Sequence, residues 1–419
     1  MNPIYLDYNA TTPVDPRVAD AIGSALRDLW GNPSSSHAYG RAAHDAVEAA
    51  RGQVAALIGA RADEIVFTGG GSEASNAAIK GVCLTRPRGL VARLFAKAMP
   101  HVITSSVEHP ATAKPLEYLR TLGVQVTVLD VDRHGLIDPD DVRRAITPRT
   151  RLVTVMHSNN ETGTLMPVRE IGNICRERGV LFHTDCAQSL GKVLVNVHDM
   201  FADLVTIAGH KLYAPKGVGA LYVREGVELE PLIHGAGHES GRRAGTENTP
   251  YIVGLGVAAD LCSVGAGSVS DGLQSSVAHA SGPDKTVAHA SGSDKTVAHA
   301  SGSDRLLRDR LHAALLAKLG DRISLNGHPE RRLPNTLNVN FHGQIGPKLL
   351  EKVPRIAASV GAACHEPKPG QVEVTPSAVL CAMRVPPDIS QGAVRLTVGR
   401  FTTEAEVDEA AELLANGAT

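Results

Sequence analysis

The stretch DLVTIAGHKLYAPKGVGALYV (203–223) decides the fold class, because it holds two apolar runs of the kind that form buried strands. The first run ends on His210 and Lys211, and the turn-rich APKGVG separates it from the second run. A lysine at a strand end is ordinarily structural, since its ammonium can reach water along an apolar stem. A lysine that reacts through its amine also needs such a sheltered place, so the neighbouring segments must decide between the two interpretations.

Seven β-rich runs lie between residues 64 and 223, and helical stretches separate several of them. Strands that alternate with helices predict an α/β fold with a mainly parallel sheet, and the Val, Ile and Leu content predicts helices on both faces. In such sheets, ligands bind beyond the carboxyl ends of the strands. The runs are EIVFT (64–68), HVITS (101–105), QVTVLDV (125–131), RLVTVM (151–156), VLFHTD (180–185), LVTIAG (204–209) and GALYV (219–223).

The last third of the chain has a different pattern. ISLNGH, TLNVNF and AVRLTV predict strands, and TTEAEVDEAAELLANG predicts a closing helix with a capping box formed by Thr403 and Glu406. We therefore expect a large domain at 15–258 and a small α+β domain composed of residues 1–14 and 259–419.

A ten-residue unit repeats within this small domain. Its copies are SVAHASGPDK (276–285), TVAHASGSDK (286–295) and TVAHASGSDR (296–305). A unit this rich in Ser, Gly, Ala and Asp cannot bury enough apolar surface to offset its ordering entropy, so we expect residues 275–305 to form a disordered insertion. The alternative is metal binding by the evenly spaced histidines, which would make a weak site without supporting carboxylates. These histidines are His279, His289 and His299.

The composition of the 419-residue chain argues against several classes of protein. Its 42 basic and 44 acidic residues nearly cancel, so we expect no nucleic-acid partner. No apolar run approaches the roughly 20 residues that a membrane helix needs, and the N-terminus lacks the layout of a signal peptide. The six cysteines show neither metal-type nor disulfide-type spacing, which favours a reducing, cytoplasmic setting.

Unusual polar residues follow several of the predicted strands. TGGGSEASN (68–76) places three glycines and Ser72 before a helix, which suits a single phosphate, although an ordinary glycine turn is the alternative. Asp185 ends VLFHTD, where a buried carboxylate is costly unless it meets a cation. His109 and Asn160 follow two other strands, and each of them alone would ordinarily be structural.

Together these residues match the needs of pyridoxal 5'-phosphate. Its aldehyde forms a Schiff base with a lysine, its ring nitrogen stays protonated beside an aspartate, and its phosphate binds at a helix N-terminus. The glycine-rich turn, Asp185 and Lys211 all fall at one predicted edge of the sheet. We therefore expect this cofactor.

Motifs along almost the whole chain, except the repeat, resemble those of the class V, fold-type-I pyridoxal-phosphate enzymes of the selenocysteine lyase and cysteine desulfurase group. The resemblance implies the fold of that group, with a seven-stranded large domain and a small C-terminal domain. The motifs are YLDYNATTPVDP, GNPSSSHAYGRAA, EIVFTGGGSEASN, SVEH, NNETG, HTDCAQ, GHKLYAPKG, RRAGTENT, ASVGAACH and RLTVGRFTT.

The resemblance also implies roles around the cofactor ring. Lys211 would bind the cofactor covalently and later move the Cα proton of the substrate. His109 would stack on the ring, Asp185 would pair with the ring nitrogen, and Gln188 would contact the phenolic oxygen.

The remaining implied roles concern the phosphate and the substrate. Gly71, Ser72 and His210 would contact the phosphate. Thr246 would reach the phosphate of the other subunit, so the resemblance implies a homodimer.

Asn160, which also belongs to the implied cofactor site, and Arg395 would bind the substrate carboxylate, for which a guanidinium fork is well shaped. Cys364 matches the nucleophilic cysteine of the family.

Departures from the desulfurase pattern favour a lyase. Ala208 stands where desulfurases usually carry a phosphate-binding Ser or Thr, and GTENTP and GAACH also resemble the lyase branch. Pro110, after the ring-stacking histidine, supports neither branch, and CHEPKPG differs from the bacterial desulfurases.

The leading hypothesis is therefore a lyase that converts L-selenocysteine to L-alanine and reduced selenium. The alternative is a cysteine desulfurase that forms a persulfide on Cys364 and passes its sulfur to an acceptor protein. A catalytically silent scaffold is a third interpretation.

Overall fold

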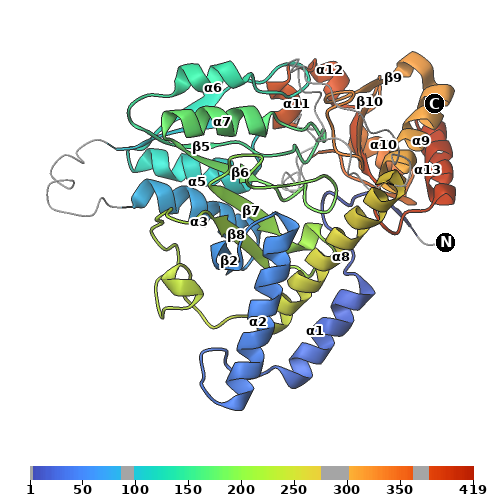
Figure 1. Cartoon of the computed structure of the whole chain (residues 1–419). Coiled ribbons are helices and arrows are strands. Elements are labelled where there is room, and N and C mark those ends of the chain that lie inside the picture. Colours follow the sequence, from blue (N-terminus) through green and yellow to red (C-terminus); the bar gives the residue numbers. More distant parts are fainter. Residues whose placement is uncertain (1–2, 86–98, 275–301, 362–376) are drawn as a thin grey trace, which may run out of the picture.

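The computed structural model of the protein describes residues 3–85, 99–274, 302–361 and 377–419 (Figure 1). Cys364 and residues 275–301 of the predicted insertion, with the three histidines, lie outside the described residues. The last four residues of the repeat, 302–305, begin helix α9 (Gly302–Leu319). The predicted disorder was therefore wrong for these four residues, which continue into a helix that packs on the rest of the small domain.

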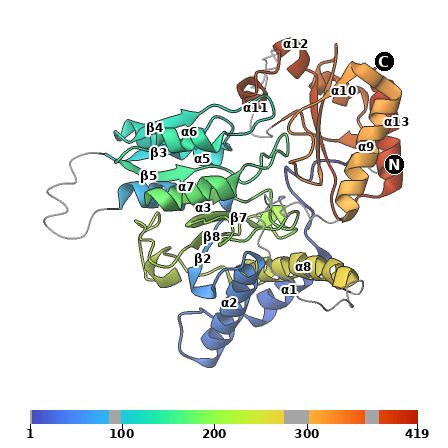
Figure 2. The same ribbon diagram turned by 45° about the horizontal axis from the view of Figure 1, so that its top comes forward.

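A seven-stranded sheet forms the centre of the larger part of the molecule (Figures 1 and 2). Its order is β2-β8-β7-β6-β5-β3-β4, and β8 is antiparallel to both of its neighbours while the other pairs are parallel. The predicted mainly parallel sheet is confirmed. β8 is reversed because the short loop after β7 cannot hold the crossover that a parallel pair requires. The strands are β2 (Ile65–Thr68), β3 (His101–Ser105), β4 (Gln125–Leu129), β5 (Thr150–Thr154), β6 (Leu181–Asp185), β7 (Leu204–Ala208) and β8 (Gly219–Val223).

Helices cover both faces of this sheet. On one face, α3 (Gly71–Leu84) and α5 (Pro110–Thr121) bury their apolar sides in a core shared with the strands. On the other face, α6 (Pro139–Ala145), α7 (Val168–Arg178) and α8 (Thr249–Gln274) contribute to a second and larger core. Both faces are thus covered, as the near-continuous Val, Ile and Leu content of the strands predicts.

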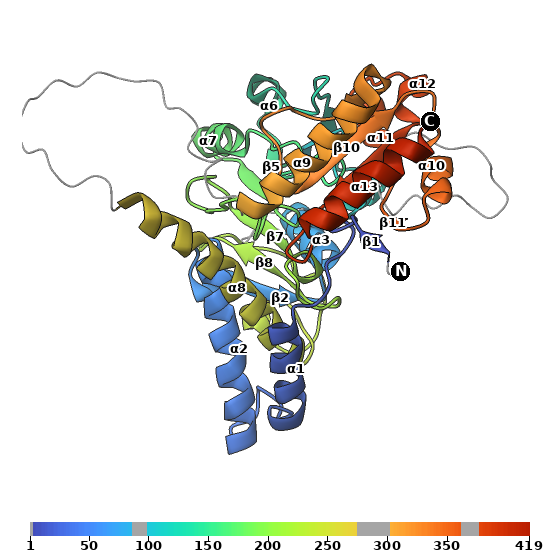
Figure 3. The ribbon, with the colours of Figure 1, turned by 90° about the vertical axis from the view of Figure 1, so that its right-hand side faces the viewer.

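Two N-terminal helices pack against α8 and extend beyond the sheet (Figure 3). They are α1 (Pro16–Asp28) and α2 (Ala38–Leu57), and their buried side chains belong to the same core as those of α8. The boundary predicted between residues 258 and 259 falls inside α8, which continues without a break. The domain limits therefore stay a prediction.

The smaller part of the molecule is built on a three-stranded antiparallel sheet of order β12-β10-β9. The N-terminal strand β1 pairs in parallel with β11, and Leu6 is buried with the side chains of α9 and α13, so the start of the chain packs in this part. The elements are β1 (Ile4–Tyr5), β9 (Ile323–Leu325), β10 (Thr336–Phe341), β11 (Ile356–Ala357), β12 (Ala393–Thr397), α10 (Gly346–Lys352), α11 (Ala378–Ala382), α12 (Pro387–Ser390) and α13 (Glu404–Gly417).

The helix-start signal predicted for α13 is present in the structure. Thr403 and Glu406 form the predicted capping box of α13, in which each side chain accepts the backbone N–H of the other residue. Short 3-10 turns complete the described secondary structure: Ala62–Glu64, Gly209–Lys211, Glu239–Gly241 and Gly320–Arg322. Within the described ranges, every helix is too short or too polar to cross a membrane.

Candidate active site

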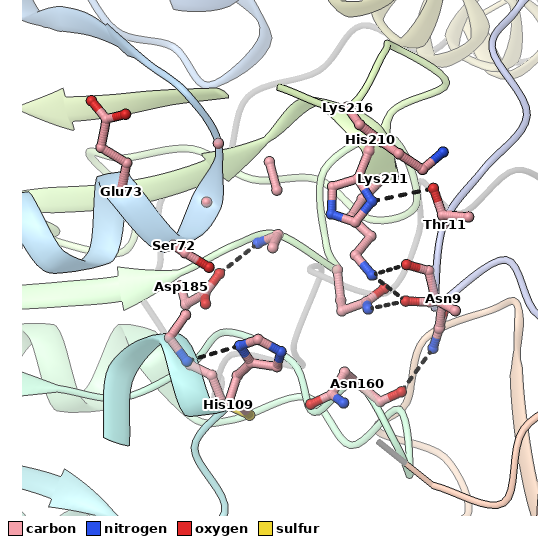
Figure 4. Close-up of a pocket in the computed structure, with 18 of the residues that line it drawn as sticks. Asn9, Thr11, Ser72, Glu73, His109, Asn160, Asp185, His210, Lys211 and Lys216 are labelled. Atoms are coloured by element: carbon pink, nitrogen blue, oxygen red, sulfur yellow. Dashed lines mark hydrogen bonds between the residues drawn. The ribbon is translucent and has the colours of Figure 1, made fainter. Parts of the chain in front are cut away.

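A cavity of about 610 Å³ lies beyond the carboxyl ends of the parallel strands (Figure 4). Loops that follow β2, β3, β5, β6 and β7 line it together with residues 9–11 of the N-terminal segment and Arg395 of β12. All of the predicted site residues line this cavity except Thr246 and Cys364. Cys364 lies outside the described residues.

Asp185 and Lys211 reach the cavity from neighbouring strands. Asp185 ends β6, which pairs in parallel with β7, and Lys211 lies in the 3-10 turn that follows β7. The two strands run in the same direction, so their carboxyl ends meet at one edge of the sheet. The structure thus brings together the two groups on which the cofactor prediction depends.

The Asp185 carboxyl group is buried and accepts the Ala187 N–H at 2.9 Å. Burial raises the pKa of this carboxyl group, while the Ala187 N–H, His109 and Lys211 offset part of the shift. A buried acid of this kind gains from a cationic partner, because pairing offsets the cost of desolvating its charge. Asp185 is therefore suited to a protonated ring nitrogen.

His109 is the N-cap residue of α5, and its Nδ1 atom accepts the Ala111 N–H at 3.1 Å. A neutral imidazole that accepts through Nδ1 has its proton on Nε2. Burial lowers the pKa of His109, and the charge of Lys211 acts in the same direction, whereas Asp185 opposes them. The cap therefore fixes a neutral ring beside Asp185 (Figure 4), which suits contact with a flat aromatic ligand.

The glycine-rich turn between β2 and α3 forms another wall of the cavity. Gly70 has φ +144° and ψ 177°, a conformation that is essentially restricted to glycine. The first N–H groups of a helix lack intrahelical acceptors, so those of α3 and the Ser72 hydroxyl can bind a phosphate. The Glu73 carboxylate points away from the other cavity residues (Figure 4). It accepts hydrogen bonds from the Gly69 N–H at 2.8 Å and from Arg243 Nε at 2.9 Å.

Lys211 contacts the N-terminal segment. Its Nζ atom donates to the backbone oxygens of Asn9 and Ala10, the latter at 2.6 Å. His210 lies 3.2 Å from the Thr11 hydroxyl, and burial, with smaller effects of nearby cations, lowers the pKa of its ring to about 4. Our sequence interpretation gave Asn9 no role, because no local pattern places residue 9 beside residue 211.

Gln188 lies between the cavity and a buried lysine that our sequence interpretation did not identify. Its Nε2 atom donates to the Asn9 backbone oxygen at 2.8 Å, and its Oε1 atom accepts from Lys192 Nζ at 2.9 Å. Burial lowers the pKa of Lys192 to about 7. The spacing of four residues, typical of side chains that meet on a helical turn, was the available signal.

Arg395 carries an almost fully buried guanidinium, with 1% of the residue exposed. Nη2 donates to Asp7 Oδ1 at 2.7 Å and Nη1 donates to the Asn160 backbone oxygen at 3.0 Å. Nε is buried and, within the described part of the chain, has no hydrogen-bond acceptor. The structure brings Arg395 and Asn160 together, and it adds Asp7, which no local sequence pattern connects to residue 395.

Thr246 lies in a smaller neighbouring cavity of about 150 Å³ rather than in the main one. The two cavities share Gly69, Gly217 and Val218 in their walls. Thr246 is thus close to the site of its own chain, and its predicted contact with the other subunit stays a prediction.

The residues of the main cavity fit pyridoxal phosphate. A helix start with a glycine-rich turn suits the phosphate, and the buried Asp185 suits the ring nitrogen. Lys211 lines the same cavity, where its amine can reach an aldehyde. The cavity volume falls in the range of roughly 300–1,000 Å³ that is usual for cofactor sites.

Comparison with known proteins decides the family. The model of the family described as "Aminotransferase class-V" matches residues 4–282, which is more than half of the chain. The chain belongs to the class V aminotransferase family. Enzymes of this family depend on pyridoxal phosphate, and their fold-type-I architecture is the one described above.

Relatives with known names match nearly the whole length of this chain. It is 43% identical to "Cysteine desulfurase" of Trichormus azollae over 99% of this chain and 92% of the relative. It is 38% identical to "Cysteine desulfurase IscS" of Dictyoglomus turgidum over 98% of this chain and 93% of the relative. These names support the alternative function that the sequence left open, and they do not support a preference for selenocysteine.

Solved structures of related proteins also match nearly the whole chain. A "NIFS-LIKE PROTEIN" has a TM-score of 0.81 and 31% identity, covering 99% of this chain and 98% of that chain. A structure titled "SspA in complex with cysteine" has a TM-score of 0.74 and 33% identity, covering 95% of this chain and 99% of that chain. The similarity therefore includes both parts of the molecule.

Proposed function

We propose that this protein is a cysteine desulfurase, which converts L-cysteine to L-alanine and leaves the substrate sulfur as a persulfide on Cys364. The observation that carries the proposal is the 43% identity to a protein named cysteine desulfurase over 99% of the chain. The reaction needs no external oxidant. The substrate carbon is reduced to a methyl group while the two sulfur atoms are oxidised to the persulfide.

Bound pyridoxal phosphate supplies an electron sink that makes the Cα–H bond of an amino acid substrate acidic. Lys211 holds the cofactor and then takes up the Cα proton. Asp185 keeps a proton on the ring nitrogen, and Gln188 donates to the phenolic oxygen. Gly71, Ser72 and His210 bind the phosphate, and His109 lies against the ring.

The substrate carboxylate binds Arg395 and the side chain of Asn160. The position of both residues on the wall of the same cavity as Lys211 supports this role. Asp7 and the Asn160 backbone oxygen hold the guanidinium in place before the substrate arrives. A pre-positioned fork lowers the entropic cost of orienting the substrate.

Cys364 receives the sulfur. Its thiolate attacks the substrate sulfur, the Cβ–S bond breaks, and an S–S bond forms. The persulfide then transfers its outer sulfur to an acceptor protein. We further propose a homodimer in which Thr246 contacts the phosphate in the other subunit.

Parallel assays of sulfide and selenide release test the function. Wild-type protein loaded with the cofactor should release sulfur from L-cysteine in the presence of a thiol. Cys364→Ser should lose most of this activity, although the visible absorption of the bound cofactor should remain. Turnover restricted to L-selenocysteine would overturn the proposal. It would support the lyase hypothesis, which the alanine at position 208 favours.

The silent-scaffold interpretation has a separate test. Bound cofactor should give visible absorption, and Lys211→Ala should remove the covalent attachment and alter that absorption. A wild-type protein that takes up no cofactor would support the scaffold and contradict the proposed enzyme.

A further inference from the structure

We propose that Lys192 is a positioning residue of the active site, which holds the Gln188 amide with its NH2 group on the side of Lys211. The inference rests on the proposed function, because it concerns the contact of Gln188 with the phenolic oxygen of the cofactor. It adds a residue that does not itself line the cavity and that acts through Gln188.

The hydrogen bonds of Lys192 set the direction of the amide. Lys192 Nζ donates to Gln188 Oε1 at 2.9 Å and to Asn9 Oδ1 at 3.3 Å. A lysine side chain has donors and, when charged, no acceptor, so the amide atom that faces it must be the oxygen. The Gln188 NH2 group is therefore directed away from Lys192.

The NH2 group faces the reactive lysine. Gln188 Nε2 donates to the Asn9 backbone oxygen at 2.8 Å, and Lys211 Nζ donates to the same oxygen. Asn9, Gln188 and Lys211 all line the cavity. The chain of contacts thus runs from Lys192 through Gln188 and Asn9 to the position where the cofactor is held.

The protonation of Lys192 does not decide this geometry. Its surroundings contain Lys211 from the turn after β7, Arg395 from β12, Cys262 from α8 and Asp304 from α9. Burial lowers the pKa of Lys192 to about 7; Lys211 and Arg395 act in the same direction, while Asp304 and Cys262 oppose it. The amine can donate hydrogen bonds in both states, and the Asn9 backbone oxygen accepts from the amide in both, so the amide keeps its direction on either side of neutral pH.

The direction of the amide changes the electronic state of the site. An NH2 donor beside the phenolic oxygen favours the ionised oxygen, whereas an amide oxygen in the same place would disfavour it. If Lys192 is lost, only the bond to the Asn9 backbone oxygen still orients the amide, so the Gln188 NH2 group is held less firmly toward the cavity. Proton uptake by the site would then occur at higher pH.

Lys192→Met tests the inference, because methionine keeps most of the volume and removes every donor. The measurement is the pH midpoint of the visible absorption change of cofactor-loaded protein, which is independent of turnover. We expect the midpoint to rise by about one pH unit. Lys192→Gln, which retains an NH2 donor, should recover part of the wild-type midpoint.

A double-mutant cycle shows whether Lys192 acts through Gln188. In a Gln188→Ala background, Lys192→Met should cause no further shift of the midpoint. Lys318→Met, which removes a lysine paired with Glu412 at the surface, should leave the wild-type midpoint unchanged. Far-ultraviolet spectra and thermal unfolding identify any variant that has lost its fold, and Lys192→Gln then carries the test.

The outcomes separate this inference from the proposed function. A wild-type midpoint in folded Lys192→Met would overturn the positioning role, even if L-cysteine still produced a persulfide on Cys364. Equal shifts in the presence and absence of the Gln188 side chain would also overturn it. A rise that depends on Gln188, together with rescue by Lys192→Gln, would support it.

Discussion

The buried Arg395 and the partly buried Asp7 form an ion pair, with 2.7 Å between Nη2 and Oδ1, although they lie 388 positions apart in the chain. Arg395 belongs to the small sheet, and Asp7 follows the first strand of the chain. The pair fixes the guanidinium at the wall of the cavity, where its Nε donor has no acceptor among the residues described. Under the proposed function, the substrate carboxylate would thus meet an arginine that is already oriented.

Asp7→Asn should therefore weaken substrate binding. The amide keeps the shape of the side chain but loses the charge that holds Arg395, which is worth about 1.5–3 kcal/mol for a charged hydrogen bond. We expect KM for L-cysteine to rise about tenfold with a smaller effect on kcat. Steady-state kinetics of Asp7→Asn and of the exposed control Asp20→Asn provide the comparison, and equal KM values would refute the role of Asp7.

Asp185→Asn should stabilise the cofactor-free protein while it damages the enzyme. Burial raises the pKa of the Asp185 carboxyl group, so the folded state binds its proton more tightly than the unfolded state. That contribution to stability is complete below the usual pKa of an aspartate and is lost as the pH rises through the raised value. At neutral pH, the buried charge therefore costs stability.

Thermal unfolding of cofactor-free protein measures this cost. At pH 7.5, Asp185→Asn should unfold about 1–3 °C above wild type, and the difference should shrink as the pH is lowered toward 4. Loaded Asp185→Asn should lose most of its kcat, because a neutral amide does not hold a proton on the ring nitrogen. A lower unfolding temperature at both pH values would contradict this account.

Ala208→Ser should slow the loss of the cofactor. Ala208 lines the cavity beside the glycine-rich turn, since a Cβ atom added at Gly71 would lie 3.0 Å from Ala208 Cβ. A hydroxyl there can add one hydrogen bond to a phosphate, worth about 1 kcal/mol, or about fivefold in the rate of cofactor loss. Ala208→Val adds volume without a donor and should not slow the loss, and equal effects of Ser and Val would rule out the hydrogen bond.

Arg51→Met should destabilise the fold. Arg51 donates through Nη1 and Nη2 to both oxygens of Glu239, at 2.7 and 2.9 Å, and Glu239 also accepts the Phe67 N–H at 2.9 Å. Removal of the arginine leaves a buried carboxylate without its cation, at a cost of about 3–5 kcal/mol. Arg61→Met, which breaks only exposed pairs, should change the free energy of unfolding by less than about 1 kcal/mol in denaturant titrations.

The sequence predicted most of the fold, because its strands are short, apolar and separated by clear helix signals. HVITS, GALYV and TLNVNF form strands with the predicted limits. The position of α8 was harder to predict, since its packing on α1 and α2 depends on contacts between residues that lie far apart in the chain. Such contacts leave no periodic signal in a single sequence.

The candidate site was predicted to the extent that its residues follow strands. Asp185 and Lys211 meet because consecutive parallel strands place their carboxyl ends together. Asp7, Asn9 and Lys192 were not assigned roles, because they act through hydrogen bonds to residues on other elements or to side chains of the site. Partners of this kind become visible when the three-dimensional arrangement is known.

The most direct test of the proposed function is the mass of the Cys364 peptide after one turnover with L-cysteine and alkylation. The account predicts one additional sulfur atom on Cys364 in wild-type protein and none in Lys211→Ala. An unmodified Cys364 in wild-type protein that has produced an equivalent of L-alanine would contradict it.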